Sequence, residues 1–178
     1  MDVAVVSNAD SANSTVGKGG KYLTFKLGRE EYGLSLIRVR EIIALMDITA
    51  VPLAPAYVRG VMNLRGRVIP VVDLRSKFGM DPTPDHDRKC IIVVDVERGG
   101  SSIQMSILVD AVSEVLHIAS EEIEDAPPFN SGVDAGFIHG IAKAKTGVKI
   151  LLDVDIILAG IESTSNGAAQ PSPAAPNA

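Results

Sequence analysis

Residues 57–78 of this chain read YVRGVMNLRGRVIPVVDLRSKF, and residues 137–158 read FIHGIAKAKTGVKILLDVDIIL. The two segments align without a gap, so that Asp73 meets Asp153 and aromatic or aliphatic residues meet residues of the same kind. Self-similarity at a fixed offset indicates that one supersecondary unit occurs twice. The sequence therefore predicts an internal repeat.

The repeat extends towards the N-terminus. Residues 32–43 align with residues 105–116, which brings Val39 onto Val112 and places a glutamate two residues later in both copies. The offset between the copies grows from 73 to 80, so the connection before the final hairpin is longer in the second copy. Each copy carries about five strands, and closing such a unit removes its exposed sheet edges.

The body of the chain is predicted to be all-β with a few short helices. Short β-branched runs between glycine-containing or charged turns predict strands at residues 22–27, 32–36, 58–64, 68–72, 89–96, 103–109, 136–142 and 148–152. Helical turns are expected at residues 37–44, 73–78 and 153–158. Pro70 lies inside a strand run, where it indicates an edge or a bulge because it cannot donate a ladder hydrogen bond.

These elements predict three parts within a body at residues 21–161. The first barrel is expected at residues 21–79, a linker at residues 80–88 and the second barrel at residues 89–161. Residues 1–20 are rich in small and polar side chains, and residues 162–178 are rich in proline and alanine. Neither segment can bury enough apolar surface to offset the entropy of ordering it, so both are predicted to be disordered tails.

Composition narrows the class of protein. The 178 residues carry a net charge of −5 and few aromatics, which argues against nucleic acid or an anionic membrane as the main partner. The single cysteine, Cys90, cannot form an internal disulfide, which fits a reducing compartment. The sequence contains no signal peptide and no apolar stretch long enough to span a bilayer. A soluble cytoplasmic protein without membrane insertion is expected.

Catalytic and metal-binding motifs are absent from the sequence. His86, His117 and His139 are scattered, and none has a second histidine or cysteine at the spacing that a metal site needs. Cys90 begins a strand run, where an inert buried thiol is the ordinary case. No cofactor, no metal ion and no enzymatic activity are expected.

One polar pair suggests a binding function. Arg65 lies at the predicted tip of a hairpin, and Glu41 is the acidic residue on the predicted short helical stretch of the same repeat. Arg65 could be only a polar turn residue. The alternative is that Arg65 and Glu41 pair across a groove and fix the loop that shapes a partner surface. An exposed pair adds little stability, so its value would lie in geometry.

The repeat unit resembles the CheW family. The resemblance is carried by residues 58–75, with the NLRG and PVVDLR motifs, by residues 31–43, and by Val51-Pro52. It continues through residues 108–116, 126–127 and 150–153, and so covers the body without either tail. It implies two five-stranded SH3-like barrels related by a pseudo-twofold axis. It also implies a non-catalytic adaptor that couples transmembrane chemoreceptors to the histidine kinase CheA in bacterial chemotaxis arrays.

The resemblance further implies where the partners bind. A groove between the barrels would receive the cytoplasmic tip of a chemoreceptor, and the regulatory domain of CheA is expected to bind chiefly the second barrel, at residues that no motif isolates. The receptor-binding groove would comprise Leu23, Leu36, Val39, Glu41, Ile42, Gly60, Asn63, Arg65 and Val112. An adaptor for a CheA-type kinase in a non-flagellar pathway, such as surface motility or development, is the alternative.

Overall fold

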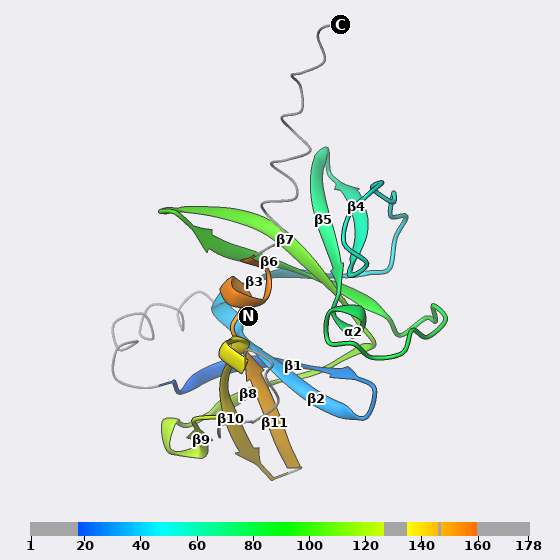
Figure 1. Ribbon diagram of the computed structural model, residues 1–178. Helices are drawn as coiled ribbons and strands as arrows, with labels where there is room; N and C mark the ends of the chain where they lie inside the picture. Colours follow the sequence, from blue (N-terminus) through cyan, green and yellow to red (C-terminus); the bar gives the residue numbers. More distant parts are fainter. Residues whose placement is uncertain (1–17, 127–134, 146, 160–178) are drawn as a thin grey trace, which may run out of the picture.

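The computed structural model describes residues 18–126, 135–145 and 147–159, which are mostly β (Figure 1). The strands are β1 (Gly20–Leu27), β2 (Glu30–Ser35), β3 (Val39–Ala44), β4 (Val58–Leu64), β5 (Arg67–Asp73), β6 (Cys90–Arg98), β7 (Ser101–Val109), β8 (Ala111–Ile118), β9 (Ile123–Glu124), β10 (Ile138–Ala144) and β11 (Gly147–Leu152). The short helices are η1 (Leu36–Arg38), α2 (Leu74–Lys77), η2 (Ser120–Glu122), η3 (Ala135–Phe137) and α3 (Val154–Ile157).

Most of both predicted tails, residues 1–17 and 162–178, lies outside the described residues. The three tail residues that are described correct the N-terminal boundary. Lys18 Nζ donates to Asp125 Oδ1 at 2.8 Å, and the Gly19 N–H donates to Ser120 Oγ at 3.1 Å. Gly20 already belongs to β1. The body therefore begins at Lys18, because tertiary partners hold this segment.

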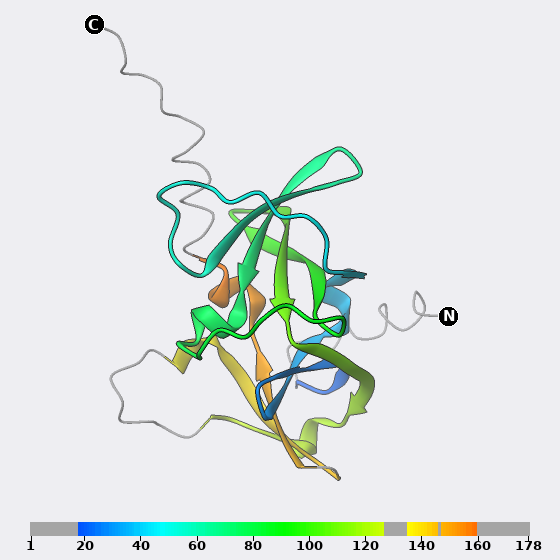
Figure 2. The ribbon, with the colours of Figure 1, turned by 90° about the vertical axis from the view of Figure 1, so that its right-hand side faces the viewer.

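The strands form a six-stranded sheet, β8-β1-β2-β11-β10-β9, and a five-stranded sheet, β3-β6-β7-β5-β4. The extra strand is β9, which has two residues. The two sheets agree with the predicted all-β, SH3-like architecture, although the ladders between the described strands do not close either sheet into a complete barrel. Figures 1 and 2 show the two sheets stacked on each other.

Each sheet contains strands from both repeats, which corrects the predicted division into residues 21–79 and 89–161. The hairpin β1–β2 joins the strands of the second repeat, and the hairpin β6–β7 joins those of the first (Figure 1). Two parallel ladders make the exchange: β2 pairs with β11, and β7 pairs with β5. Parallel strands cannot be joined by a tight turn, so each partner comes from a distant segment.

The register of the ladders confirms the repeat. The hairpins β4–β5 and β10–β11 share the same irregularity, between Val58 and Gly60 in one and between Ile138 and Gly140 in the other. The ladder of β3 skips one residue after Val39, and the ladder of β8 skips one after Val112. The two copies therefore repeat each other down to single bulges, as a pseudo-twofold arrangement requires.

The apolar side chains form a central core between the two sheets. A smaller core packs against the opposite face of each sheet. The central core takes alternate residues of β1 and of its counterpart β6: Leu23, Phe25, Leu27, Ile92, Val94 and Val96. Residues of the opposite parity enter the smaller cores, where Tyr22 matches Ile91. Successive side chains of a strand point to opposite faces, so each sheet is apolar on both faces here. The central core holds the two sheets together.

The prediction of a helical turn at residues 37–44 is wrong for most of its length. Only η1 is helical, and residues 39–44 form the edge strand β3, which pairs with β6. The side chains of β3 alternate between half-buried and exposed, which is the period of a strand. Its β-branched residues also favour a strand over a helix.

Pro70 lies in β5, whose ladder with β7 begins one residue later, at Val71. Residues 67–70 of β5 therefore pair only with β4, and this stretch has the edge character predicted for Pro70.

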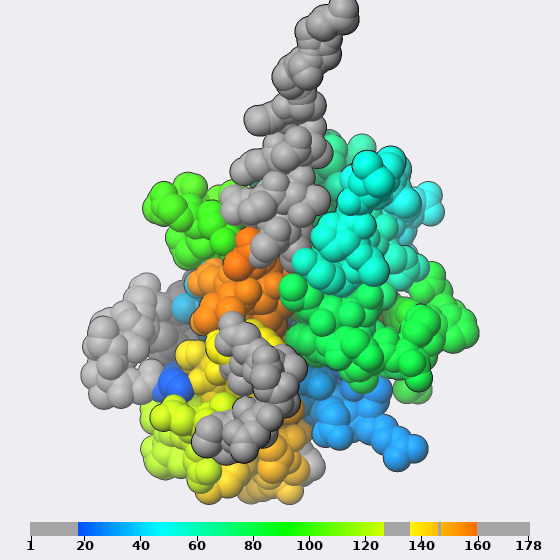
Figure 3. Space-filling model, viewed as in Figure 1, coloured from blue at the N-terminus to red at the C-terminus, as the bar shows by residue number. Residues whose placement is uncertain are grey.

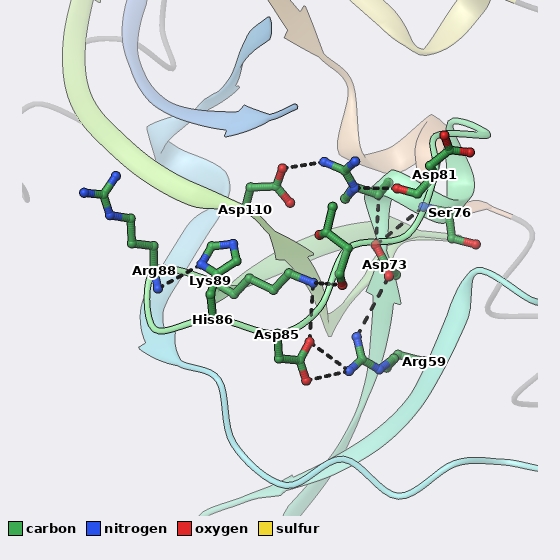
Figure 4. A network of polar contacts seen from close by, with 11 residues as sticks. Arg59, Asp73, Ser76, Asp81, Asp85, His86, Arg88, Lys89 and Asp110 are labelled. Carbon is green, nitrogen blue, oxygen red and sulfur yellow. Dashed lines mark hydrogen bonds and ion pairs between the residues drawn. The ribbon is translucent and has the colours of Figure 1, made fainter. Parts of the chain in front are cut away.

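The linker between the repeats is tied to the body by a polar network (Figure 4). The Lys89 ammonium, with its side chain 3% exposed, donates to the Thr83 carbonyl at 3.1 Å and to Asp85 Oδ1 at 3.3 Å. Arg59 of β4 donates to both Asp85 oxygens. Burial by itself would raise the pKa of Asp85, but the hydrogen bonds and charges of Arg59 and Lys89 together outweigh it and lower the pKa. Arg75 Nε donates to the Asp81 carbonyl at 2.9 Å, which holds the start of the linker.

Candidate functional site

The apolar residues predicted to line a groove lie on β1, η1, β3 and β8. Leu36, Val39 and Val112 are half-buried and pack against this core. Ile42 is 44% exposed. Leu23 is only 1% exposed, so its side chain offers no surface to a partner and supports its neighbours from behind. Leu23 therefore differs from the groove-lining position expected for it.

Strand register places the exposed apolar residues on matching faces of two edge strands. Ile42 of β3 lies opposite Ile92, and Val115 of β8 lies opposite Leu23. Directly paired residues share a face, so Ile42 and Val115 both face the side of the central core. Val115 is 48% exposed and occupies the position equivalent to Ile42. Sequence analysis missed Val115, although the alignment of the repeats already placed it there.

The polar pair predicted from the sequence is present. Arg65 donates two hydrogen bonds to Glu41, at 3.0 Å to Oε1 and at 2.8 Å to Oε2. This bidentate contact lowers the pKa of Glu41 and raises that of Arg65, mainly through the hydrogen bonds themselves. Arg65 has a φ of 54°, and Asn63 Oδ1 accepts from the Gly66 N–H at 2.8 Å, which closes the turn. Arg65 is 69% exposed, so the guanidinium is accessible to a partner.

Gly60 has a backbone role. Its φ is 145°, and a Cβ atom placed on it would lie 2.1 Å from the Thr49 carbonyl oxygen. The Thr49 N–H donates to the Val61 carbonyl, so the loop before β4 crosses directly over the glycine. Gly60 is buried beneath this crossing. Only glycine permits such a close approach, and Gly60 therefore fixes the loop beside the hairpin that carries Arg65.

A further polar contact, not predicted from the sequence, holds the corner between β2 and β3. Arg38 of η1 donates to Asp155 of α3 and to the Asp95 carbonyl of β6. The equivalent corner, between β7 and β8, is held by Asp110, which pairs with Arg75 of α2. The sequence did contain a signal for these two contacts. In the alignment of the repeats Arg75 lies opposite Asp155, so the charge is reversed at a position whose neighbours match.

The interior of the six-stranded sheet is more polar than that of its counterpart. Lys149, 4% exposed in its side chain, donates to Glu31 Oε1 at 2.5 Å and occupies the position of Ile69. The hydrogen bond from Lys149 lowers the pKa of Glu31. Ser113 donates to the other oxygen of Glu31 at 3.3 Å.

In the part of the chain that the structure describes, the groups with possible reactivity are not gathered into a site. Burial raises the pKa of the Cys90 thiol, so the thiolate is disfavoured. Burial, together with the charge of Lys18, lowers the pKa of His139. Within residues 18–126, 135–145 and 147–159, no group of three potential metal ligands occurs, and no helix could cross a membrane.

Comparisons with known proteins agree with this architecture. The family model of the CheW-like domain matches residues 21–162. A probable chemotaxis protein CheW of Rhizobium etli is 35% identical over 79% of this chain and 88% of its own length. The chemotaxis protein CheW of Klebsiella aerogenes is 33% identical over 85% and 87%. The crystal structure of the scaffolding protein TtCheW from Thermoanaerobacter tengcongensis superposes with a TM-score of 0.70 at 33% identity, covering 79% of this chain and 93% of that one. With its two sheets, its repeat and these relatives, the chain belongs to the CheW family.

Proposed function

We propose that this protein is a non-catalytic chemotaxis adaptor that couples the cytoplasmic tips of chemoreceptors to the histidine kinase CheA. It would work in the cytoplasm and be recruited to membrane-associated receptor arrays. Family membership supports this function, as do the names of relatives that match over most of their length. The regulatory domain of CheA would bind chiefly through the second repeat.

Receptor binding is supported mainly by the apolar residues on the two edge strands β3 and β8. Val39 and Ile42 on β3, and Val112 and Val115 on β8, face the same side as the central core. An amphipathic helix binds through apolar residues that repeat along one of its faces, and such strands offer complementary contacts. We call Leu36, Val39 and Ile42 the first receptor wall, Val112 and Val115 the second, and the five residues together the receptor walls. The Arg65–Glu41 pair would orient the receptor, because a fixed guanidinium gives directional hydrogen bonds.

The experiment measures binding of the purified chain to a receptor cytoplasmic fragment and to CheA by calorimetry. Kinase ATP turnover is followed in the ternary mixture. We expect the wild type to bind both partners and to change turnover only when receptor is present. Arg65→Ala should weaken receptor binding by roughly three- to tenfold, because it removes a partly exposed orienting charge.

Arg67→Ala is the matched control, because Arg67 lies on the same hairpin and is also exposed. It should bind receptor as tightly as the wild type. If Arg65→Ala and Arg67→Ala weaken binding equally, the effect is one of net charge and the orienting role is lost. If the wild type binds neither the receptor fragment nor CheA, the proposed function is wrong and the family resemblance describes only the fold.

A further inference from the structure

Arg38 joins three elements at the corner where the first receptor wall begins. Its Nη1 donates to the Asp95 carbonyl of β6 at 2.9 Å and to Asp155 Oδ1 of α3 at 3.1 Å, and its Nη2 donates to Asp155 Oδ2. Asp155 Oδ1 also accepts from the Glu97 N–H at 2.8 Å. The Arg38 and Asp155 side chains are 26% and 30% exposed, so solvent screens this contact only in part.

The corner has little stability of its own. The helix η1 has three residues and no side-chain cap, and its C-terminal hydrogen bond runs from the Val39 N–H to the Leu36 carbonyl. So short a 3-10 turn depends on tertiary contacts. Arg38 lies between Leu36 and Val39, two members of the receptor walls. The contact that fixes them therefore comes from α3, 117 residues further along the chain.

The second wall has the same arrangement with the charges reversed. Asp110 directly precedes β8, and its Oδ2 accepts from Arg75 Nη1 of α2 at 2.6 Å and from the Gly28 N–H at 2.7 Å. Figure 3 shows the orange surface of α3 beside the green surface that contains α2. Both short helices therefore hold, through one ion pair each, the corner at which a wall begins.

We propose that Arg38 and Asp155 are positioning residues for receptor binding: their ion pair fixes η1 and the start of β3 in the geometry that a receptor helix contacts. This inference rests on the proposed function. It assigns the last helix of the described chain a role in the wall that Leu36, Val39 and Ile42 form in the first repeat. Neither side chain needs to touch the receptor.

The experiment uses Arg38→Met and Asp155→Asn in the full chain. Methionine keeps an extended apolar stem, and asparagine keeps an acceptor for the Glu97 N–H. We expect each variant to weaken binding of the receptor fragment roughly fivefold, with CheA affinity unchanged within about twofold. The double variant should bind no more weakly than either single variant, because both remove one contact. Hydrogen exchange should accelerate at the amides of residues 36–39.

Arg40→Met is the matched control. Arg40 lies on β3, two residues after Arg38, and pairs with Asp95 at 3.5 Å, so its replacement removes the same charge close by without affecting α3. It should leave receptor affinity and exchange at residues 36–39 as in the wild type. Melting curves by circular dichroism show whether a variant has lost its fold, in which case Asp155→Asn, the milder change, decides.

The outcomes separate this inference from the proposed function. If Arg65→Ala weakens receptor binding and Arg38→Met does not, the positioning role is overturned while the adaptor function stands. Equal losses of receptor and CheA affinity would also overturn it, because they indicate general damage. If the wild type binds no receptor fragment, the proposed function fails. In that case, unchanged hydrogen exchange at residues 36–39 in Arg38→Met would also show that the ion pair does not hold η1 in place.

Discussion

Gly60 shows how one residue can determine the course of a loop. The Thr49 carbonyl and the Ala50 Cα occupy the space where a Cβ would lie. At the equivalent Gly140, the Cβ position meets Ile123 and the Glu124 carbonyl of β9. In both repeats, therefore, a segment that precedes the final hairpin crosses its first strand at a glycine. At Gly60 the crossing is backbone against backbone, so it cannot be relieved by turning a side chain; at Gly140 the nearest atom is the Ile123 side-chain Cγ2.

We predict that Gly60→Ala lowers the free energy of unfolding by about 2–4 kcal/mol, because the loop must move and the backbone is strained. Gly66→Ala is the control: its φ is 86°, but nothing lies within 4 Å of its Cβ position. It should lose only about 1 kcal/mol. Urea unfolding followed by circular dichroism measures both. Equal losses would show that steric overlap with the loop does not matter.

The Glu31–Lys149 pair gives a pH dependence whose sign follows from the lowered pKa of Glu31. A lowered folded-state pKa contributes stability above the ordinary value of 4.5, and this stability disappears as the pH falls through the folded-state pKa. We predict that the wild type loses more stability than Lys149→Met between about pH 5 and about pH 3. Urea unfolding at several pH values tests this. Parallel curves for the two proteins would contradict it.

At the scale of elements, the two α-helical turns begin in the same way. Asp73 Oδ1 accepts from the Arg75 and Ser76 N–H groups at 3.0 and 3.4 Å, and Asp153 Oδ1 accepts from the Asp155 and Ile156 N–H groups at 3.0 and 3.3 Å. Each aspartate thus satisfies N–H groups that a helix leaves unpaired at its start. The helices are four residues long, so the cap is a large part of what defines them.

We predict that Asp73→Ala and Asp153→Ala each lower the free energy of unfolding by about 1 kcal/mol, the usual value for a lost cap. Asp73→Asn and Asp153→Asn should retain most of it, since asparagine also accepts these bonds. Urea midpoints at constant slope provide the comparison. If the asparagine variants lose as much as the alanine variants, the carboxylate charge matters more than the cap.

For the whole molecule, the two ion pairs of reversed polarity give a physical reason why the chain folds into one of two possible topologies. The observed exchange of hairpins places Arg38 beside Asp155 and Asp110 beside Arg75. If each repeat instead closed on itself, β2 would lie beside β5 and β7 beside β11. Arg38 would then meet Arg75, and Asp110 would meet Asp155. Repulsion between like charges disfavours that alternative, which is discrimination by an unfavourable contact.

We predict that Arg75→Asp combined with Asp110→Arg folds but refolds less selectively. Native pairs of opposite charge remain possible in this variant, yet the self-closed topology gains such pairs too. The recovery of native monomer after dilution from urea, measured by size-exclusion chromatography, should fall at least twofold. Adding Arg38→Asp and Asp155→Arg restores the reversed polarity and should recover the yield. Equal recovery for all three proteins would contradict this explanation.

The sequence by itself determined the features that depend on local chemistry and on the repeat. These are most of the strands, though not β3, β8 or β9, the capping aspartates, and the equivalence of Val39 with Val112. Each is fixed by residue type and spacing within a few residues, or by comparison of the two copies. The same alignment also contained Val115 and the reversed charges at Arg75 and Asp155, but it could not show what they contact.

Only the tertiary structure decided which hairpin enters which sheet, that residues 39–44 form an edge strand, and that Leu23 is a core residue. The physical reason is common to all three. A period of two or of 3.6 residues says which side chains share a face, but two equivalent repeats offer that face two equivalent partners. The choice depends on contacts between distant segments, among them the ion pair of Arg38 with Asp155.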